Sequence, residues 1–231
     1  MFDFSFLVQI LPAMMQGLRV TVMATLGGYA IALAVGLVLA LARRSGNRAV
    51  RHLCGLYIDF VRCTPLLVQL YFAFYVLPSA GIRFSALTTG ILVLGLNIGA
   101  YVAEVYRSGI ESIPSGQWEA ARSLGLTSVP IWVKVILPQA LPPMLPPLGN
   151  ILIGLFKETP LLAAITVIDV FGTANGIAGV TYRYTEPYTA AAIILLAVSL
   201  IAAALVRRLE HRFRPAQARA GNPGRDWSGA G

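Results

Sequence analysis

Five long apolar stretches run through this chain, and they restrict its fold more than any other feature. Each approaches or exceeds the roughly 20 mostly apolar residues that an α-helix needs to cross a membrane. The stretches are residues 17–42, 53–78, 87–106, 141–170 and 188–206. Only 12% of the 231 residues are charged, against about 25% in soluble domains. The sequence therefore predicts an all-α membrane protein with about five transmembrane helices.

Basic residues mark one side of the predicted membrane protein. Thirteen of them lie in alternate connections or after the last span: Arg43, Arg44, Arg48, Arg51, Arg107, Arg122, Lys134, Arg207, Arg208, Arg212, Arg214, Arg219 and Arg225. The other connections hold Arg83 and Arg183. Short loops rich in lysine and arginine stay in the cytoplasm, so we expect the N-terminus outside and the C-terminus inside. This placement of the charge argues against nucleic acid as the partner of a chain of net charge +8.

The two ends of the chain differ from the spans. Residues 2–16 are amphipathic, and we expect them along the outer membrane interface, with Phe2, Phe4 and Phe6 as anchors. Residues 215–231 are rich in Ala, Gly, Pro and Arg and have little to bury, which predicts a disordered cytoplasmic tail. Residues 1–214 then form a single transmembrane domain.

Residues 115–138, the segment 115–138 below, are a polar interruption between the third and fourth spans. The pattern predicts a short helix that starts at Pro114 and Ser115 and a second helix capped by Thr127 or Ser128. Gly125 is placed to end the first helix in a left-handed cap. Trp118, Ala121 and Leu124 share one apolar face at helical spacing. On physical grounds alone this is an amphipathic helix at the membrane surface.

The fourth span begins with a proline cluster. The prolines are Pro138, Pro142, Pro143, Pro146 and Pro147. Proline removes a helical hydrogen bond, so this part should be kinked or non-helical. Pro160 should interrupt the span again, directly after Lys157, Glu158 and Thr159. Broken helices with polar residues at membrane depth are typical of a transport path.

Charged residues within the spans are costly and must face protein or water. They are Arg62, Glu104, Lys157 and Glu158. One interpretation is structural pairing, for example of Arg62 with Glu104 or Glu158. The other is that some of them line a substrate route. The neutral Gln69 and Asn97 could simply hydrogen-bond between helices.

Several kinds of site lack sequence support. No GxxxxGK[ST] loop is present, so the chain does not hydrolyse ATP by that route. Cys54 and Cys63, with His52 and His211, have no metal-site spacing, and a structural disulfide is not expected. We expect no catalytic, cofactor-binding or metal-binding residues.

An intramembrane enzyme and an ion-gradient secondary transporter are the rival interpretations, although no inverted repeat is visible.

The amino-acid sequence of the segment 115–138 also resembles a known family signature. Glu119-Ala120-Ala121, then Gly125, then Val135 to Pro138 resemble the EAA signature of permease subunits of bacterial ABC importers, with Val135 where the family usually has Ile. In that family the segment is a cytoplasmic coupling helix that docks on the ATPase. The resemblance implies coupling roles for Gln117, Trp118, Glu119, Ala120, Ala121 and Gly125.

Two further stretches resemble the polar amino-acid branch of these importers. Residues 61–70, VRCTPLLVQL, are similar to that branch's FRGTPLLVQL, and residues 157–161, KETPL, are similar to KDTSL. Residues 186–188 also match, and together the similar stretches cover most of residues 15–213. Within the branch the sequence of these stretches is most similar to that of the ectoine and hydroxyectoine permease.

The resemblance implies a MetI-like type I ABC importer permease fold in a bacterial inner membrane. The chain would import a zwitterionic solute, ectoine or a polar amino acid, and would not itself be an enzyme. Implied partners are a cytoplasmic ABC ATPase dimer that binds ATP and Mg, a second permease subunit and an extracytoplasmic solute-binding protein. The expected substrate path comprises Arg62, Thr64, Gln69, Asn97, Glu104, Lys157, Glu158 and Thr159.

Overall fold

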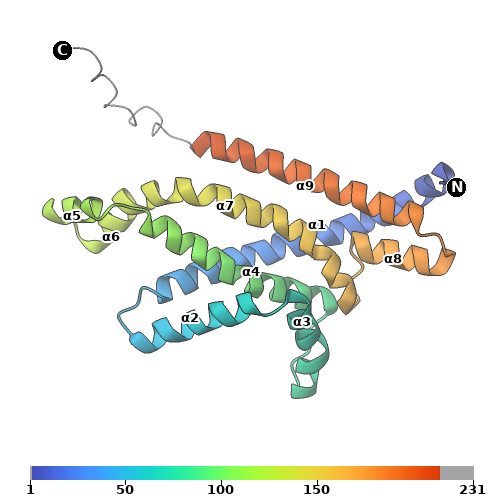
Figure 1. Ribbon diagram of the computed structural model, residues 1–231, viewed down its shortest axis with the longest axis horizontal. Helices are drawn as coiled ribbons and strands as arrows, with labels where there is room; N and C mark the ends of the chain where they lie inside the picture. The colour runs from blue at the N-terminus through green and yellow to red at the C-terminus, as the bar shows by residue number, and fades with distance from the viewer. Residues whose placement is uncertain (1, 214–231) are drawn as a thin grey trace, which may run out of the picture.

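The computed structural model describes residues 2–213, which form an all-helical protein without strands in that range (Figure 1). Four of its helices are long and apolar enough to cross a membrane: Phe4–Ala42, Ala86–Glu111, Ser128–Ile165 and Thr185–Glu210. A fifth crossing results if the bent pair Arg48–Cys63 and Leu66–Ala80 counts as one span. The predicted fold class is therefore confirmed. The predicted tail, residues 215–231, lies outside the described residues.

The helices follow one another with short connections. In chain order they are α1 (Phe4–Ala42), α2 (Arg48–Cys63), α3 (Leu66–Tyr71), the π-helical η1 (Phe72–Val76), the 3-10 helix η2 (Leu77–Ala80), α4 (Ala86–Glu111), α5 (Ser115–Ser123), α6 (Ser128–Pro130), the π-helical η3 (Ile131–Ile136), α7 (Leu137–Glu158), the 3-10 helix η4 (Thr159–Ile165), α8 (Val170–Thr181) and α9 (Thr185–Phe213).

The N-terminal residues do not form the separate interfacial helix that was predicted, because α1 runs unbroken from Phe4 to Ala42. Asp3 caps it by accepting hydrogen bonds from the backbone N–H groups of Ser5 and Phe6. Ile10 and Met14 are buried against α8 and α9. Packing against these two helices extends the first span through residues that composition alone assigned to the interface.

The second predicted span, residues 53–78, is broken in the structure. α2 and the following helical run meet at an angle of 104°. The break lies at Thr64, whose backbone is extended (φ −110°, ψ 138°), and at Pro65. A residue before proline is disfavoured in the helical region, so the Thr-Pro step ends α2. The sequence carried this signal, although the apolar run had been assigned to one straight helix.

The start of the fourth span is helical despite the proline cluster, so the non-helical alternative of the prediction is wrong. Pro142, Pro143, Pro146 and Pro147 all lie inside α7, and Ser128–Ile165 is one apolar helical run without a bent break. The irregularity lies just before the prolines, in the π-helical η3. The second helix of the segment 115–138 is therefore continuous with the fourth span. At Pro160 the predicted change is present, because α7 ends at Glu158 and a 3-10 helix follows.

α4 packs mainly against α1 through glycines. A Cβ atom on Gly36 would lie 2.5 Å from Cγ1 of Val102, and one on Gly95 would lie 2.5 Å from Cγ2 of Ile31. Small residues allow two membrane helices to approach closely and gain dispersion contacts along their backbones. This α1–α4 seam is a closely packed part of the framework that holds the remaining helices.

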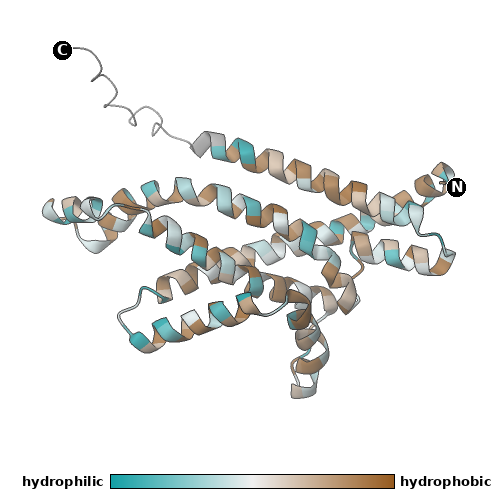
Figure 2. Ribbon diagram, viewed as in Figure 1, coloured by the Kyte–Doolittle hydropathy of each residue, from teal (hydrophilic) through white to brown (hydrophobic). Residues whose placement is uncertain are grey.

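The connections sort to two ends of the molecule. The α1–α2 connection, the α5–α6 region and the C-terminal end of α9 lie at one end, whereas the N-terminus and α8 lie at the other (Figure 1). Hydrophilic residues gather at the first end, on α5, the start of α2 and the end of α9, and apolar residues cover most of the helix lengths between the ends (Figure 2). This matches the predicted alternation of basic and non-basic connections.

Candidate functional site

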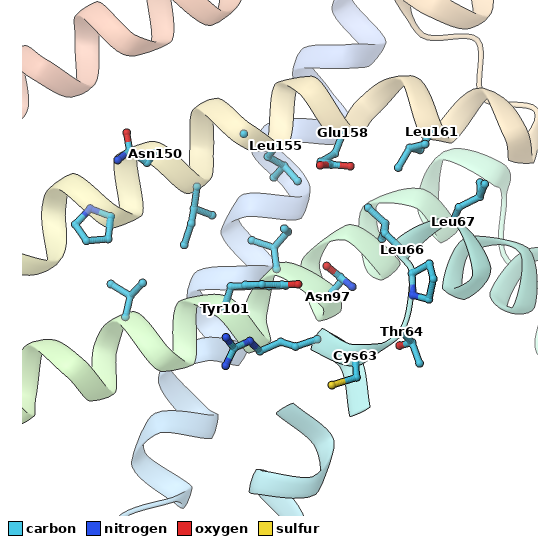
Figure 3. A pocket seen from close by; sticks show the side chains of 17 residues that line it. Cys63, Thr64, Leu66, Leu67, Asn97, Tyr101, Asn150, Leu155, Glu158 and Leu161 are labelled. Carbon is cyan, nitrogen blue, oxygen red and sulfur yellow. The ribbon is translucent and has the colours of Figure 1, made fainter. Parts of the chain in front are cut away.

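A cavity of about 1050 Å³ lies between the end of α2, the α2–α3 turn, α4 and α7 (Figure 3). Most of its wall is apolar. Its polar and charged side chains are Arg62, Thr64, Asn97, Tyr101, Asn150 and Glu158. A largely apolar cavity with a few polar groups of defined position is typical of sites for small molecules.

The broken α2–α3 corner forms a polar network at one wall of the cavity. The amide nitrogen of Gln69 donates to Thr64 Oγ1 (2.7 Å) and to the carbonyl oxygen of Val61 (3.0 Å). Asn97 of α4, only 5% exposed, donates through Nδ2 to Oε1 of Gln69 at 3.1 Å. The inter-helix hydrogen bond predicted for Gln69 and Asn97 is thus present. It fixes the turn, which would otherwise leave backbone carbonyl groups unpaired at the break.

Charges of both signs line the same cavity. The guanidinium of Arg62 lies over the ring of Tyr101, 5.4 Å from its centroid, in the geometry of a cation–π contact. Glu158 enters from α7 and points into the same space (Figure 3). Among the side chains that the structure describes, those of residues 2–210, neither Arg62 nor Glu158 forms an ion pair. Both charges are therefore free to meet a ligand.

The predicted pairing of Arg62 with Glu104 or Glu158 is wrong. Glu104 instead forms ion pairs with Arg43 of α1 and with Arg107, one turn further along α4. Glu104 lies two helical turns after Asn97, towards the end of α4 where these arginines are located. Glu104 therefore links α4 to the end of α1 and does not line the cavity.

Three more predicted path residues are absent from the cavity wall: Lys157, Thr159 and Gln69, of which Gln69 lies behind the wall and bonds to Thr64 and Asn97. Lys157 is exposed and is absent from the cavity wall. Thr159 is fully buried, and its hydroxyl donates to the carbonyl oxygen of Phe156 at 3.0 Å. Adjacent residues on a helix point about 100° apart, which is why Glu158 reaches the cavity and its two neighbours do not.

Tyr101 and Asn150 line the cavity but were not predicted. Tyr101 follows Asn97 by four residues, and Asn150 precedes Glu158 by eight, so each shares a helix face with a predicted residue. Extending the search along those two faces would have found both. Tyr101 resembled an ordinary interfacial aromatic, and Asn150 followed the prolines that were expected to disrupt the helix.

The segment 115–138 contains the predicted glycine turn. α5 ends at Ser123, and Gly125 has a φ of +73°. The N–H of Leu126 donates to the carbonyl oxygen of Ala121 (3.2 Å), and the N–H of Gly125 to that of Arg122 (2.9 Å). These two bonds close the helix C-terminus in a Schellman-type turn, for which glycine is strongly favoured. The left-handed cap is therefore confirmed.

One side of α5 is covered by the protein itself. Ala121 is buried, and the Trp118 ring lies edge-on to that of Trp132, with centroids 5.2 Å apart. The guanidinium of Arg44 lies within 6 Å of both ring centroids. These contacts fix the segment 115–138 against the end of α1.

The other side of α5 is exposed. It presents Gln117, Glu119 and Ala120, and Glu119 has no ion pair with the described side chains of residues 2–210. Leu124, predicted on the apolar face, is 79% exposed. Thr127 precedes the next helix as predicted but makes no side-chain cap. A turn held rigidly on one side and open on the other is suited to contact a further protein.

Comparison with known proteins gives a consistent picture. Residues 32–215 match the family described as "Binding-protein-dependent transport system inner membrane component". The chain is 40% identical over 205 residues to a probable amino-acid ABC transporter permease protein, y4tG, of Sinorhizobium fredii, covering 89% of each chain. It is 34% identical to the glutamine transport system permease protein GlnP of Escherichia coli, covering 92% of this chain and 98% of the relative.

Solved structures share the architecture. A crystal structure of an amino acid ABC transporter with histidines aligns with a TM-score of 0.86 at 38% identity, covering 92% of this chain and 99% of the other. An inward-facing MetNI methionine ABC transporter aligns with a TM-score of 0.70 at 19% identity, over 92% and 99% of the chains. The second likeness concerns the fold alone, and it agrees with the predicted MetI-like arrangement.

Proposed function

The chain belongs to the family of binding-protein-dependent transport system inner membrane components, and we propose that it is the permease subunit of an ATP-driven importer for a zwitterionic solute. The observation that carries this proposal is the cavity between α2, α4 and α7, where Arg62 and Glu158, without an ion pair among the described side chains of residues 2–210, face the same space. A solute with a carboxylate and a cationic nitrogen needs one partner of each sign.

The cavity suggests a role for each polar residue. Arg62 meets the carboxylate of the solute, since a planar guanidinium can bind both oxygens. Glu158 meets the ammonium or amidinium group, and Asn97 and Asn150 offer amide hydrogen bonds. The ring of Tyr101 holds the Arg62 side chain in place. Lys157, Glu104 and Thr159 have supporting roles, because they lie outside the cavity wall.

The identity of the solute is proposed at two levels. The names of similar permeases refer to amino acids, to glutamine and to L-cystine, which favours a polar amino acid. The sequence resemblance to the ectoine and hydroxyectoine permease supports ectoine as the specific solute within the zwitterionic class. Isothermal titration of the associated solute-binding protein with ectoine, glutamine and arginine would decide between them.

The energy for import comes from a separate ATPase. The exposed side of α5, with Gln117, Glu119 and Ala120, docks in the ATPase, while Trp118, Ala121 and Gly125 hold that side in place. This requires the end of the molecule with α5 to face the cytoplasm, as the positive-inside rule indicates. A second permease subunit completes the passage, and an extracytoplasmic binding protein delivers the solute. A secondary transporter would need no such ATPase.

Cys63 offers a direct test of the cavity, because it is exposed on the cavity wall, whereas Cys54 does not line it. In a Cys54→Ser background, a maleimide should modify Cys63 and abolish uptake by proteoliposomes that contain the assembled transporter. Saturating solute should slow the modification. The matched Cys54→Ser, Cys63→Ser protein should keep its uptake after the same treatment. Full modification of Cys63 without loss of uptake would remove the cavity from the transport path.

The docking role of α5 has its own test. Glu119→Lys combined with Gly125→Val reverses the exposed charge and places a branched residue at a left-handed φ. The double variant should lose the co-purifying ATPase or hydrolyse ATP without uptake. Ser115→Ala, at the first residue of α5, is the control. Normal uptake and normal stimulation of the ATPase by the double variant would refute the coupling assignment.

A further inference from the structure

A second pocket lies at the α5 end of the molecule, where α1 passes into α2. Its volume is about 680 Å³. Six basic side chains line it: Arg43, Arg44, Arg48, Arg51, His52 and Arg107. Glu111 is the single acidic residue in its wall, and the last turn of α1 closes it through Ala40. The pocket shares no lining residue with the cavity that contains Arg62 and Glu158.

The charges of this basic pocket are only partly balanced by the protein. Arg43 and Arg107 bind Glu104, and Arg107 also binds Glu111. Five arginines against these two carboxylates leave three net positive charges. In the part of the chain whose side chains are described, residues 2–210, no ion pair involves Arg48 or Arg51. The pocket is therefore electrostatically suited to an anion.

The position of Arg48 and Arg51 strengthens this interpretation. Both lie in the first turn of α2, whose N-cap is Asn47 and which has no acidic residue in that turn. The N-terminus of a helix carries partial positive charge, so arginines there are unfavourable unless an anion is nearby. The positive-inside rule requires basic residues in this connection, but it does not require them at a helix N-terminus.

The surroundings indicate what kind of anion binds. The pocket lies at the end of α1, a helix long and apolar enough to cross a membrane, and the end of such a helix reaches the headgroup region. One to two turns further along α2, Leu53 is 63% exposed and Leu56 is 59% exposed. A free anion would leave these apolar side chains exposed, whereas the acyl chains of a lipid would cover them.

We propose that this basic pocket binds the phosphate of an acidic phospholipid headgroup. The guanidinium groups of Arg48 and Arg51 meet the phosphate oxygens, for which arginine has the matching planar geometry. Basic pockets between membrane helices on the cytoplasmic side are a known type of site for acidic lipid headgroups. Leu53 and Leu56 lie along the first part of the acyl chains.

Lipid retention by the assembled transporter tests the proposal. Native mass spectrometry would measure bound phosphatidylglycerol and phosphatidylcholine in wild type, in Arg48→Gln, Arg51→Gln and in the control Arg207→Gln, Arg208→Gln. The control removes two charges from the same end of the molecule, on α9, outside the pocket. Wild type and control should retain phosphatidylglycerol preferentially. The pocket variant should bind it about 25-fold more weakly, because each of the two basic residues near an anionic surface strengthens binding about fivefold.

Three results would overturn the proposal: equal retention in wild type and pocket variant, equal loss in pocket variant and control, and binding of inorganic phosphate by wild type without preferential retention of phosphatidylglycerol. Loss of the ATPase from the pocket variant with unchanged lipid would assign the arginines to a protein contact instead. If the pocket variant does not fold, Arg48→Lys, Arg51→Lys keeps the charge but removes the planar donors, and it should show weakened retention.

Discussion

The two faces of α4 differ in how closely they are packed. One face lies against α1, where Gly95 and Gly99 bring the backbones so close that a Cβ would meet a side chain within 3 Å. The other face carries Asn97 and Tyr101 into a cavity of about 1050 Å³. A residue on the first face has almost no space, whereas residues on the second have space that the chain does not fill.

This difference separates framework from function. Close packing between membrane helices depends on dispersion contacts, which are lost when backbones move apart. A cavity wall can keep polar groups only if the helix that presents them is fixed from behind. The packed face of α4 therefore allows its open face to hold Asn97 in a hydrogen bond and Tyr101 against Arg62. Substitutions on the packed face should damage folding, and those on the open face should damage transport.

The largest effect is expected from Gly95→Ala on the packed face. The new Cβ would lie 2.5 Å from Cγ2 of Ile31 and 3.1 Å from the carbonyl oxygen of Gly28, so α1 and α4 must separate. Overpacking of this kind costs about 3 kcal/mol, and we expect a strong loss of folded protein by size-exclusion chromatography.

Gly154→Ala is the matched control for this change. Gly154 lies on α7 at the cavity, and no heavy atom lies within 4 Å of a Cβ built there. Alanine is favoured over glycine in a helix by about 0.5–1 kcal/mol, so the control should fold at least as well as wild type. Equal yields of both variants would contradict the distinction between the two faces.

Across from the open face of α4, Glu158→Gln should leave folding intact and reduce uptake. Loss of a hydrogen bond to a charged group costs about 1.5–3 kcal/mol, so uptake at low solute concentration should fall about 10- to 100-fold. Lys157→Gln is the control, since Lys157 is adjacent but lies outside the cavity. Unchanged kinetics and selectivity in Glu158→Gln would exclude this carboxylate from the site.

Gln69→Leu should reduce both folding stability and uptake, each by less than the variants above. It leaves Nδ2 of the buried Asn97 without its partner, at a cost of about 1–3 kcal/mol. The double variant Gln69→Leu, Asn97→Leu should recover part of the melting temperature, because no buried polar group is then unpaired. A double variant that is less stable than either single variant would show that the hydrogen bond is not the stabilising element.

The sequence predicted the helices better than their interruptions. Apolar length and the basic connections identified the spans, and Gly125 identified the turn after α5. The non-helical alternative for the proline-rich start of α7 is wrong, because rules for isolated helices do not include the packing that keeps Pro142 to Pro147 helical. The Thr64–Pro65 break was missed although its signal is local.

The candidate site was only partly predictable for a related reason. Composition identifies charges that must face protein or water, and two of the charges that it selected, Arg62 and Glu158, line the cavity. It cannot identify their partners, since the pairing of Glu104 with Arg43 depends on how α1 and α4 pack together. Tyr101 could be assigned to the cavity only from the structure, which shows that the face of α4 with Asn97 lines it.

The smallest effect is expected at the other end of α1, where a polar contact replaces the seam. Asp3 binds Arg183 at 3.0 Å, and its pKa is lowered by the backbone N–H of Phe6 and by Arg183. A lowered pKa gives stability above the unfolded value of about 3.8, which is lost as the pH falls through the folded value. Asp3→Asn should therefore melt slightly below wild type at neutral pH, and the difference should vanish in acid.

Melting curves of the two proteins between neutral pH and pH 3 would measure this difference, with Asp59→Asn on α2 as the control. A loss as large as that of Gly95→Ala would mean that α1 is held by its polar end. A small and pH-dependent loss would mean that the glycine seam holds α1, and that Asp3 and Arg183 only align its first turn with α9.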